Sequence, residues 1–244
     1  MSPYVTECPY CGQRVRRRAP KIQRGEEGEP RNRRRKRPRL SRIKPNEIAG
    51  IAPDTRPVAT ISLIAISLLV TLAIATGAVS LLDVGGILVP IEDDPWRYVT
   101  APFIHDSLGY QFATLLGVGI FGSMLERRFG LFAPILVFLL AGAASSAAGV
   151  AADMAPPFED VNLGYWVIGA NGAALGMLFA WLVDDRRAGR RGEQRGNDML
   201  GVTVFAAVLL LLPLAIEEAS FAAGLAGAAV GALLGLLLPI LSRR

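Results

Sequence analysis

The stretch FAAGLAGAAVGALLGLLLPIL, Phe221–Leu241, contains no charged residue and places glycine at every fourth position along much of its length. A helix needs about 20 apolar residues to cross the ~30 Å hydrocarbon core of a bilayer, because each residue rises 1.5 Å. The spacing of Gly227, Gly231 and Gly235 puts them on one helix face, where small side chains permit close packing in lipid. This stretch therefore predicts a membrane helix that packs tightly against a neighbour.

Five further apolar segments precede it. The six predicted membrane helices are Val58–Leu82, Tyr110–Leu125, Leu131–Ala152, Tyr165–Val183, Met199–Ile216 and Phe221–Leu241. Hydrophobic residues make up 52% of the 244 residues and the mean hydropathy is +0.38, which a soluble domain with an ordinary surface would not reach. The second segment is short and rich in glycine, so we expect it to be packed among the others. The predicted fold class is an all-α membrane protein, a bundle of six transmembrane helices.

A second glycine pattern opens the fourth segment, at Gly169, Gly172 and Gly176. We expect this face to meet the glycine face of the sixth segment. Asn171 lies within the pattern, and a polar amide near the membrane surface is costly in lipid. We therefore expect its side chain to face the bundle interior and to bond a backbone carbonyl or water.

The distribution of basic residues predicts the orientation. Lysine and arginine are retained on the cytoplasmic side of a membrane. Of the 26 lysines and arginines, only Arg97 falls outside residues 1–57, the turn 126–130, the loop 184–198 and the C-terminus. The intervening loops carry acidic residues instead. The prediction is a multi-pass protein of the cell membrane with both termini in the cytoplasm.

Residues 1–57 are predicted to form a disordered basic cytoplasmic tail, separate from a membrane domain over residues 58–244. The run RNRRRKRPR, Arg31–Arg39, has too little apolar content to fold alone. Such a run can bind anionic lipid headgroups at about 1 kcal/mol per basic residue, or nucleic acid through its phosphates. Its place beside a bilayer favours lipid over nucleic acid. A run that only sets the topology is the alternative.

Two cysteines, Cys8 and Cys11, have the Cys-x-x-Cys spacing of a zinc knuckle. A closed tetrahedral zinc site needs four ligands. The sole histidine, His105, lies across the membrane in the predicted topology, so one chain cannot complete the site. The prediction is a remnant knuckle without metal, and a zinc ion shared between two chains is the alternative.

Unusual residues follow one another in a set order from residue 94 to residue 238. They are Trp96-Arg97 in the first outer loop, His105 before the second helix, Gly122, Glu126 and Gly130 in a G-x-x-x-E-x-x-x-G pattern, Gly169-Ala170-Asn171-Gly172 opening the fourth helix, and Gly227, Gly231 and Gly235 on the sixth. This order resembles the rhomboid family of intramembrane serine proteases. The resemblance implies a six-helix rhomboid-like bundle.

The catalytic positions that the resemblance implies are changed. The family has a nucleophilic serine opening the fourth helix and a histidine base on the sixth, and these positions read Asn171 and Gly224 here. The family pattern H-x-x-x-N on the second helix, which helps to hold the oxyanion, falls on Tyr110 and Thr114. The resemblance thus implies a protease scaffold without its catalytic pair.

Residue chemistry leads to the same expectation. Acyl transfer needs a hydroxyl or thiol with a base in hydrogen-bond reach, and Asn171 is neither. The lysines all lie in the tail, at Lys21, Lys36 and Lys44. His105 with Ser107 is the only residual pair, in a loop with no evident third partner.

Two short segments that contain charged residues are expected to have structural roles. Trp96 and Arg97 are expected to anchor the outer loop at headgroup level. The segment Glu126–Arg128 is expected to be a salt-bridged turn whose charges water can reach.

The predicted function is a catalytically inactive rhomboid-like protein that binds transmembrane segments of other proteins or supports a membrane complex. An active intramembrane serine endopeptidase with a non-standard site is the alternative. A lipid-handling or transport role is a further one, but no acid or base is expected at mid-membrane, which disfavours ion coupling.

Overall fold

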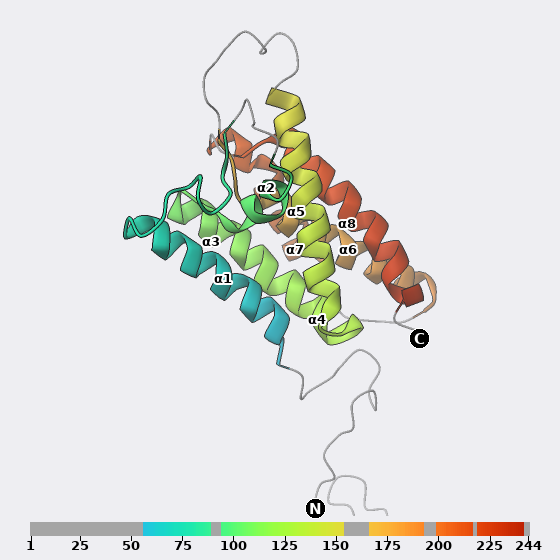
Figure 1. Ribbon diagram of the computed structural model, residues 1–244. Helices are drawn as coiled ribbons and strands as arrows, with labels where there is room; N and C mark the ends of the chain where they lie inside the picture. The colour runs from blue at the N-terminus through green and yellow to red at the C-terminus, as the bar shows by residue number, and fades with distance from the viewer. Residues whose placement is uncertain (1–55, 89–93, 154–165, 193–198, 217–218, 242–244) are drawn as a thin grey trace, which may run out of the picture. The chain divides into compact units, whose positions relative to one another are not determined.

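The apolar segments fold as helices. The computed structural model describes residues 56–88, 94–153, 166–192, 199–216 and 219–241 (Figure 1). The helices are α1 (Val58–Ala75), α2 (Arg97–Thr100), α3 (Leu108–Gly117), α4 (Ser123–Phe129), α5 (Phe132–Asp153), α6 (Asn171–Arg190), α7 (Met199–Leu211) and α8 (Phe221–Leu241). Residues 1–55 of the basic tail, with the Cys8 and Cys11 knuckle, lie outside the described residues.

Short irregular elements complete the architecture. A π-helical turn, η2 (Val118–Gly122), joins α3 and α4 into one continuous helix. The 3-10 turns η1 (Ala101–Phe103) and η3 (Leu212–Leu214) follow α2 and α7. Two short strands, β1 (Ile87–Leu88) and β2 (Trp166–Val167), pair antiparallel, with Ile87 opposite Val167.

Four helices of the described ranges are long and apolar enough to cross a membrane. They are Val58–Ala75, Leu108–Phe129, Phe132–Ala152 and Phe221–Leu241. These four agree with four of the six predicted segments. Of the other two segments, α6 carries several charges in its second half and α7 has 13 residues. That α6 and α7 also cross the membrane stays a prediction.

The fourth predicted segment differs most from the observed helix. The sequence predicts a helix from Tyr165, whereas α6 begins at Asn171. The later start follows because Gly169 adopts φ +102° and ends the preceding extended chain. A Cβ at Gly169 would overlap the ring of Tyr110, so only glycine fits there. The helix then continues to Arg190, which places Asp184 inside it and not in a loop as predicted.

Helices α6 and α8 approach each other backbone to backbone, with α5 packed along both (Figure 1). A Cβ on Gly227 would overlap the carbonyl oxygen of Gly172, and one on Gly231 would overlap that of Gly176. This confirms that the two glycine faces meet. Gly169 is the exception, since its neighbour is a tyrosine of α3 and not α8.

Glu126 of α4 is buried against the start of α1. Its Oε1 accepts the Ala59 N–H at 2.9 Å, and its Oε2 accepts the N–H and the hydroxyl of Thr60, both at 2.8 Å. The N-cap of α1 is Pro57, which offers no side-chain acceptor, so a carboxylate from a distant helix satisfies the free N–H groups of the first turn. Only 7% of Glu126 is exposed. The predicted water-accessible turn is therefore wrong for this residue.

Arg128 forms an ion pair with Asp184, which joins α4 to α6. Asp184 is fully buried. An unpaired buried carboxylate would cost several kcal/mol, so the arginine is needed where the acid lies. The charge pair thus holds the end of the bundle where α1 begins and α4 ends.

Replacing Glu126 by alanine should lower the free energy of unfolding by about 2–3 kcal/mol, because buried N–H groups lose a charged acceptor. Unfolding of the purified protein in detergent micelles, followed by circular dichroism, measures this loss. Glu126→Gln keeps one acceptor oxygen and should lose less. Equal stability of Glu126→Ala and the exposed-site control Arg127→Gln would contradict the capping role.

Replacing Gly231 by alanine should destabilise the protein by about 1–3 kcal/mol, because the methyl group must displace the α6 backbone. Gly189→Ala is a matched control on α6, where a Cβ meets nothing within 4 Å. The control should be neutral or slightly stabilising, since alanine favours helix more than glycine does. The same unfolding assay compares the two, and equal effects would refute the close contact.

Candidate functional site

Asn171 and Gly224, the two positions that the resemblance matches to a catalytic pair, lie side by side. Asn171 is the first residue of α6, and Gly224 lies in the first turn of α8. A Cβ on Gly224 would lie 3.5 Å from Asn171 Nδ2 and 3.1 Å from Leu175 Cδ1. The contact of Gly227 with Gly172, which directly follows Asn171, holds these positions together. The fold therefore brings together two residues that are 53 positions apart in the sequence.

The side chain of Asn171 is 3% exposed. Neither Oδ1 nor Nδ2 has a hydrogen-bond partner among the described residues. The predicted interior position is confirmed. The described residues provide no backbone carbonyl bond to this amide, and the predicted bond to water stays a prediction. A buried polar group without a partner costs about 1–3 kcal/mol, so any polar group that reaches this amide is bound favourably.

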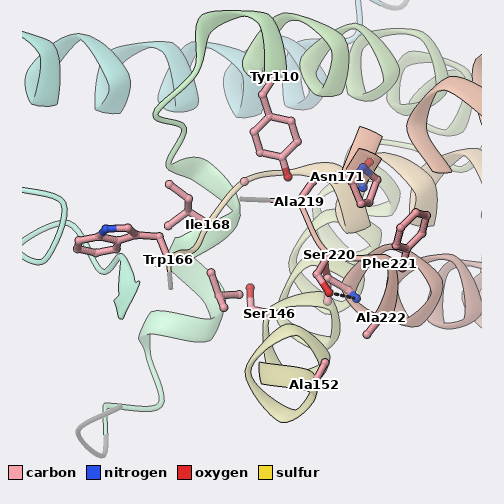
Figure 2. Close-up of a pocket in the computed structure, with 15 residues that line it drawn as sticks. Tyr110, Ser146, Ala152, Trp166, Ile168, Asn171, Ala219, Ser220, Phe221 and Ala222 are labelled. Atoms are coloured by element: carbon pink, nitrogen blue, oxygen red, sulfur yellow. Dashed lines mark hydrogen bonds between the residues drawn. The ribbon is translucent and has the colours of Figure 1, made fainter. Parts of the chain in front are cut away.

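A cavity of about 400 Å³ lies beside Asn171. In Figure 2, Tyr110 enters from one side, Trp166 and Ile168 from another, and Ser220, Phe221 and Ala222 from the side opposite the latter. The cavity wall includes Tyr110, Ser145, Ser146, Trp166, Ile168, Gly169, Asn171, Ser220, Phe221 and Ala223. None of the described residues of this wall is an acid, a histidine or a lysine. The cavity can therefore bind neutral polar groups, and the described part of its wall offers no proton acceptor of catalytic strength.

The serine hydroxyls of the wall have local roles. Ser146 Oγ donates to the Gly142 carbonyl at 3.1 Å, within α5. Ser220 Oγ accepts the Ala223 N–H at 3.5 Å, at the start of α8 (Figure 2). Ser145 packs directly against Gly172, where a Cβ would overlap its hydroxyl. These contacts place the hydroxyls around the cavity without pairing any of them with a base.

His105 lies in the loop before α3, next to the start of α6, and is 1% exposed. The Ala170 N–H donates to its Nε2 at 3.2 Å, so Nε2 is unprotonated and the ring proton is on Nδ1. Nδ1 faces Ser67 Oγ at 3.3 Å, and Nε2 also lies 3.1 Å from Thr114 Oγ1. Because Ala170 directly precedes Asn171, this histidine positions the start of α6.

The residual pair of His105 with Ser107 is not formed. Ser107 Oγ instead accepts the Tyr110 N–H at 3.4 Å and caps α3. The ring nitrogens of the histidine are taken up by the contacts with Ser67, Thr114 and Ala170. The hypothesis that this pair performs chemistry is therefore not supported by the geometry.

Tyr110 and Thr114, the altered positions on the second predicted helix, both belong to the site. The edge of the Tyr110 ring meets His105, with ring centroids 5.4 Å apart, and the same ring packs on Gly169. The Thr114 hydroxyl donates to the Tyr110 carbonyl at 2.9 Å. Both residues thus support the loop that leads into α6.

Arg97 holds the outer loop together. Its Nη1 donates to the carbonyls of Leu82 and Gly86 at 3.0 and 2.9 Å, and its Nε pairs with Asp94 at 3.0 Å. Trp96 is 45% exposed, with the guanidinium 5.1 Å from its ring centroid. An anchoring role of this pair at headgroup level stays a prediction.

Sequence reasoning missed three polar residues that join α1 to this region. Gln111 Nε2 donates to Thr71 Oγ1 at 2.7 Å and to the Ser67 carbonyl at 3.3 Å. The sequence contained a signal for this contact, because Ser67 and Thr71 lie four residues apart and are the polar residues in the second half of this helix. Polar side chains in a membrane helix face the bundle interior.

Comparison with known proteins adds a family match. A family model described as Rhomboid domain matches residues 92–240, a range that contains Asn171, Gly224 and the other residues of the site. A comparison with curated proteins finds no match for the chain.

The stability of the protein should fall as the pH is lowered from 6.5 towards 4. Burial lowers the pKa of His105 from 6.5 to about 4, so the folded state binds fewer protons than the unfolded state between these values. The stability that the neutral His105 contributes is fully present above pH 6.5. Roughly 2–3 kcal/mol of this stability is lost when the pH reaches the pKa of about 4 that His105 has in the folded state. Thermal unfolding in micelles between pH 7.5 and 4.5 measures the slope. His105→Gln should flatten it, and an unchanged slope would contradict the assignment.

Proposed function

Because this chain belongs to the rhomboid family of membrane proteins, we propose that it binds transmembrane segments of other proteins and does not cleave them. One observation carries the proposal. Where α6 and α8 meet, the facing groups are the amide of Asn171 and the bare α-carbon of Gly224. An amide is not a nucleophile at neutral pH and glycine offers no base, so the facing pair cannot start acyl transfer.

Within the part of the chain that the structure describes, no group beside Asn171 replaces the missing base. His105, the sole histidine of the chain, uses Nε2 to accept a backbone N–H and is not part of the cavity wall. The ordinary base of a serine nucleophile must reach its hydroxyl at about 2.6–3.2 Å. The geometry of the site therefore favours binding over catalysis.

The same cavity supports a binding role. It combines hydroxyl groups with the unsatisfied amide of Asn171, and Phe221 at its wall is 47% exposed. A partner segment can place an apolar side chain against Phe221 and a polar group near the amide. From the arginine distribution we also infer that both termini are cytoplasmic, which puts this cavity on the outer side of the membrane.

The double substitution Asn171→Ser with Gly224→His should produce cleavage of a generic transmembrane substrate. A side chain at position 224 requires a small shift of the Leu175 side chain, because a Cβ there would lie 3.1 Å from Leu175 Cδ1. Gel analysis of co-reconstituted substrate compares the double variant with Gly224→His alone and with the parent protein, neither of which should cleave. The rate should be low, since Tyr110 and Thr114 differ from the family pattern. Cleavage by the parent protein would overturn the proposal.

A photo-crosslinking amino acid at position 221 should capture a membrane protein in native membranes, because Phe221 lies at the cavity. Position 233 is a matched control, since Leu233 is exposed on the same helix and is not part of the cavity wall. Mass spectrometry of the products identifies the partner. If position 221 recovers no membrane protein, and deletion of the chain leaves membrane-protein levels unchanged, a binding role is ruled out.

An active intramembrane serine endopeptidase is the second candidate, and one observation favours it. The hydroxyl of Ser145 lies in the cavity against Gly172, one residue after Asn171. A fluorophosphonate probe that labels the purified protein, with labelling lost in Ser145→Ala or Ser107→Ala, would support this candidate over the binding role.

A further inference from the structure

A second cavity, of about 300 Å³, opens between the continuous α3–α4 helix, α6 and α7. Its wall is apolar and includes Ile120, Phe121, Met124, Trp181, Val202 and Phe205. The aromatic rings form one cluster, with the Phe121 centroid 5.6 Å from Trp181 and 6.0 Å from Phe205. The cavity lies apart from the site at Asn171, and the two share no wall residue.

The size of this cavity favours a chain over a helix. One turn of an α-helix, about 10–12 Å across and 5.4 Å long, occupies roughly 400–600 Å³. The cavity is smaller than one such turn, so a helix could insert only a side chain. A flexible acyl chain is narrow enough to enter, and its methylene groups match a wall without charges.

Charge at the mouth identifies the kind of lipid. Ile120, Met124 and Arg127 lie along one face of the continuous helix, at i, i+4 and i+7. Arg127 therefore lies about one turn beyond the cavity wall, and it is exposed. Its neighbour Arg128 is neutralised by Asp184, and Glu126 is turned towards α1. Among the described residues of this helix face, Arg127 thus provides a positive charge that is complementary to an anionic headgroup.

We propose that this cavity binds one acyl chain of an anionic phospholipid, whose headgroup phosphate is held by Arg127. One basic residue near a membrane surface is worth about 1 kcal/mol. The site therefore prefers an anionic over a zwitterionic headgroup about fivefold. This inference does not depend on the proposed binding of transmembrane segments, because it concerns another cavity and other residues.

Tryptophan fluorescence tests the proposal. Trp96→Phe with Trp166→Phe leaves Trp181 as the only tryptophan, since the chain has 3. The full chain is reconstituted in phosphatidylcholine vesicles that contain bromine-labelled phosphatidylglycerol or bromine-labelled phosphatidylcholine. Quenching of Trp181 should saturate at an about fivefold lower mole fraction of the anionic lipid.

Two substitutions with matched controls separate the parts of the site. Arg127→Gln should make quenching by the two lipids saturate at the same mole fraction. The control Arg190→Gln removes an exposed arginine of α6 and should leave the difference between the lipids unchanged. Val202→Phe fills the cavity and should weaken quenching by both lipids. Val204→Phe adds the same ring at an exposed position of α7 outside the cavity wall and should have no effect.

A second measurement uses the unmodified chain. Native mass spectrometry after detergent exchange should retain phosphatidylglycerol on the parent protein and lose it in Val202→Phe. Quenching that rises linearly and equally with both lipids would overturn the proposal. So would a headgroup preference that survives Arg127→Gln, or lipid retention that Val202→Phe leaves unchanged.

Discussion

The close approach of α6 to α8 is the contact on which the arrangement of the other described elements depends. In a membrane there is little hydrophobic drive between helices, so packing and hydrogen bonds must hold them together. The absence of side chains at Gly227 and Gly231 lets the α8 backbone rest on the carbonyls of Gly172 and Gly176. The contact lies directly beside Asn171 and Gly224. It thereby determines both the proximity of these two residues and one wall of the cavity beside Asn171.

Buried polar groups connect the remaining helices to this pair. At one end of the bundle these groups are charged: Glu126 caps α1 from α4, and Arg128 binds Asp184 of α6. In the other region they are neutral, with His105 joining Ser67 of α1, Thr114 of α3 and the backbone before α6. Each group is paired across elements, which a low-dielectric environment demands. Asn171, the first residue of α6, is the exception, because its buried side-chain amide has no partner among the described residues. It lies beside the cavity.

Two cavities result, and they differ in chemistry because different residues line them. The cavity beside Asn171 carries hydroxyl groups and an unsatisfied amide, which suits polar groups of a partner. The cavity at Trp181 has an apolar wall and an exposed arginine one turn beyond it, which suits a lipid. Under our two proposals the rhomboid scaffold serves binding at two separate places, and Asn171 and Gly224 occupy the positions that the resemblance matches to the catalytic pair.

The sequence by itself determined the membrane character, the glycine faces and the pair Asn171 and Gly224, because length, hydropathy and residue order are local properties of the chain. It did not determine the role of Glu126, which resembles an exposed interfacial acid until α1 folds against it. Nor did it determine the partners of His105, or that Gly169 packs on Tyr110 and not on α8. Apart from the contact of His105 with Thr114, those contacts join residues from 38 to 67 positions apart. Only the tertiary structure could decide them, because no local pattern encodes which buried donor will lie opposite which acceptor.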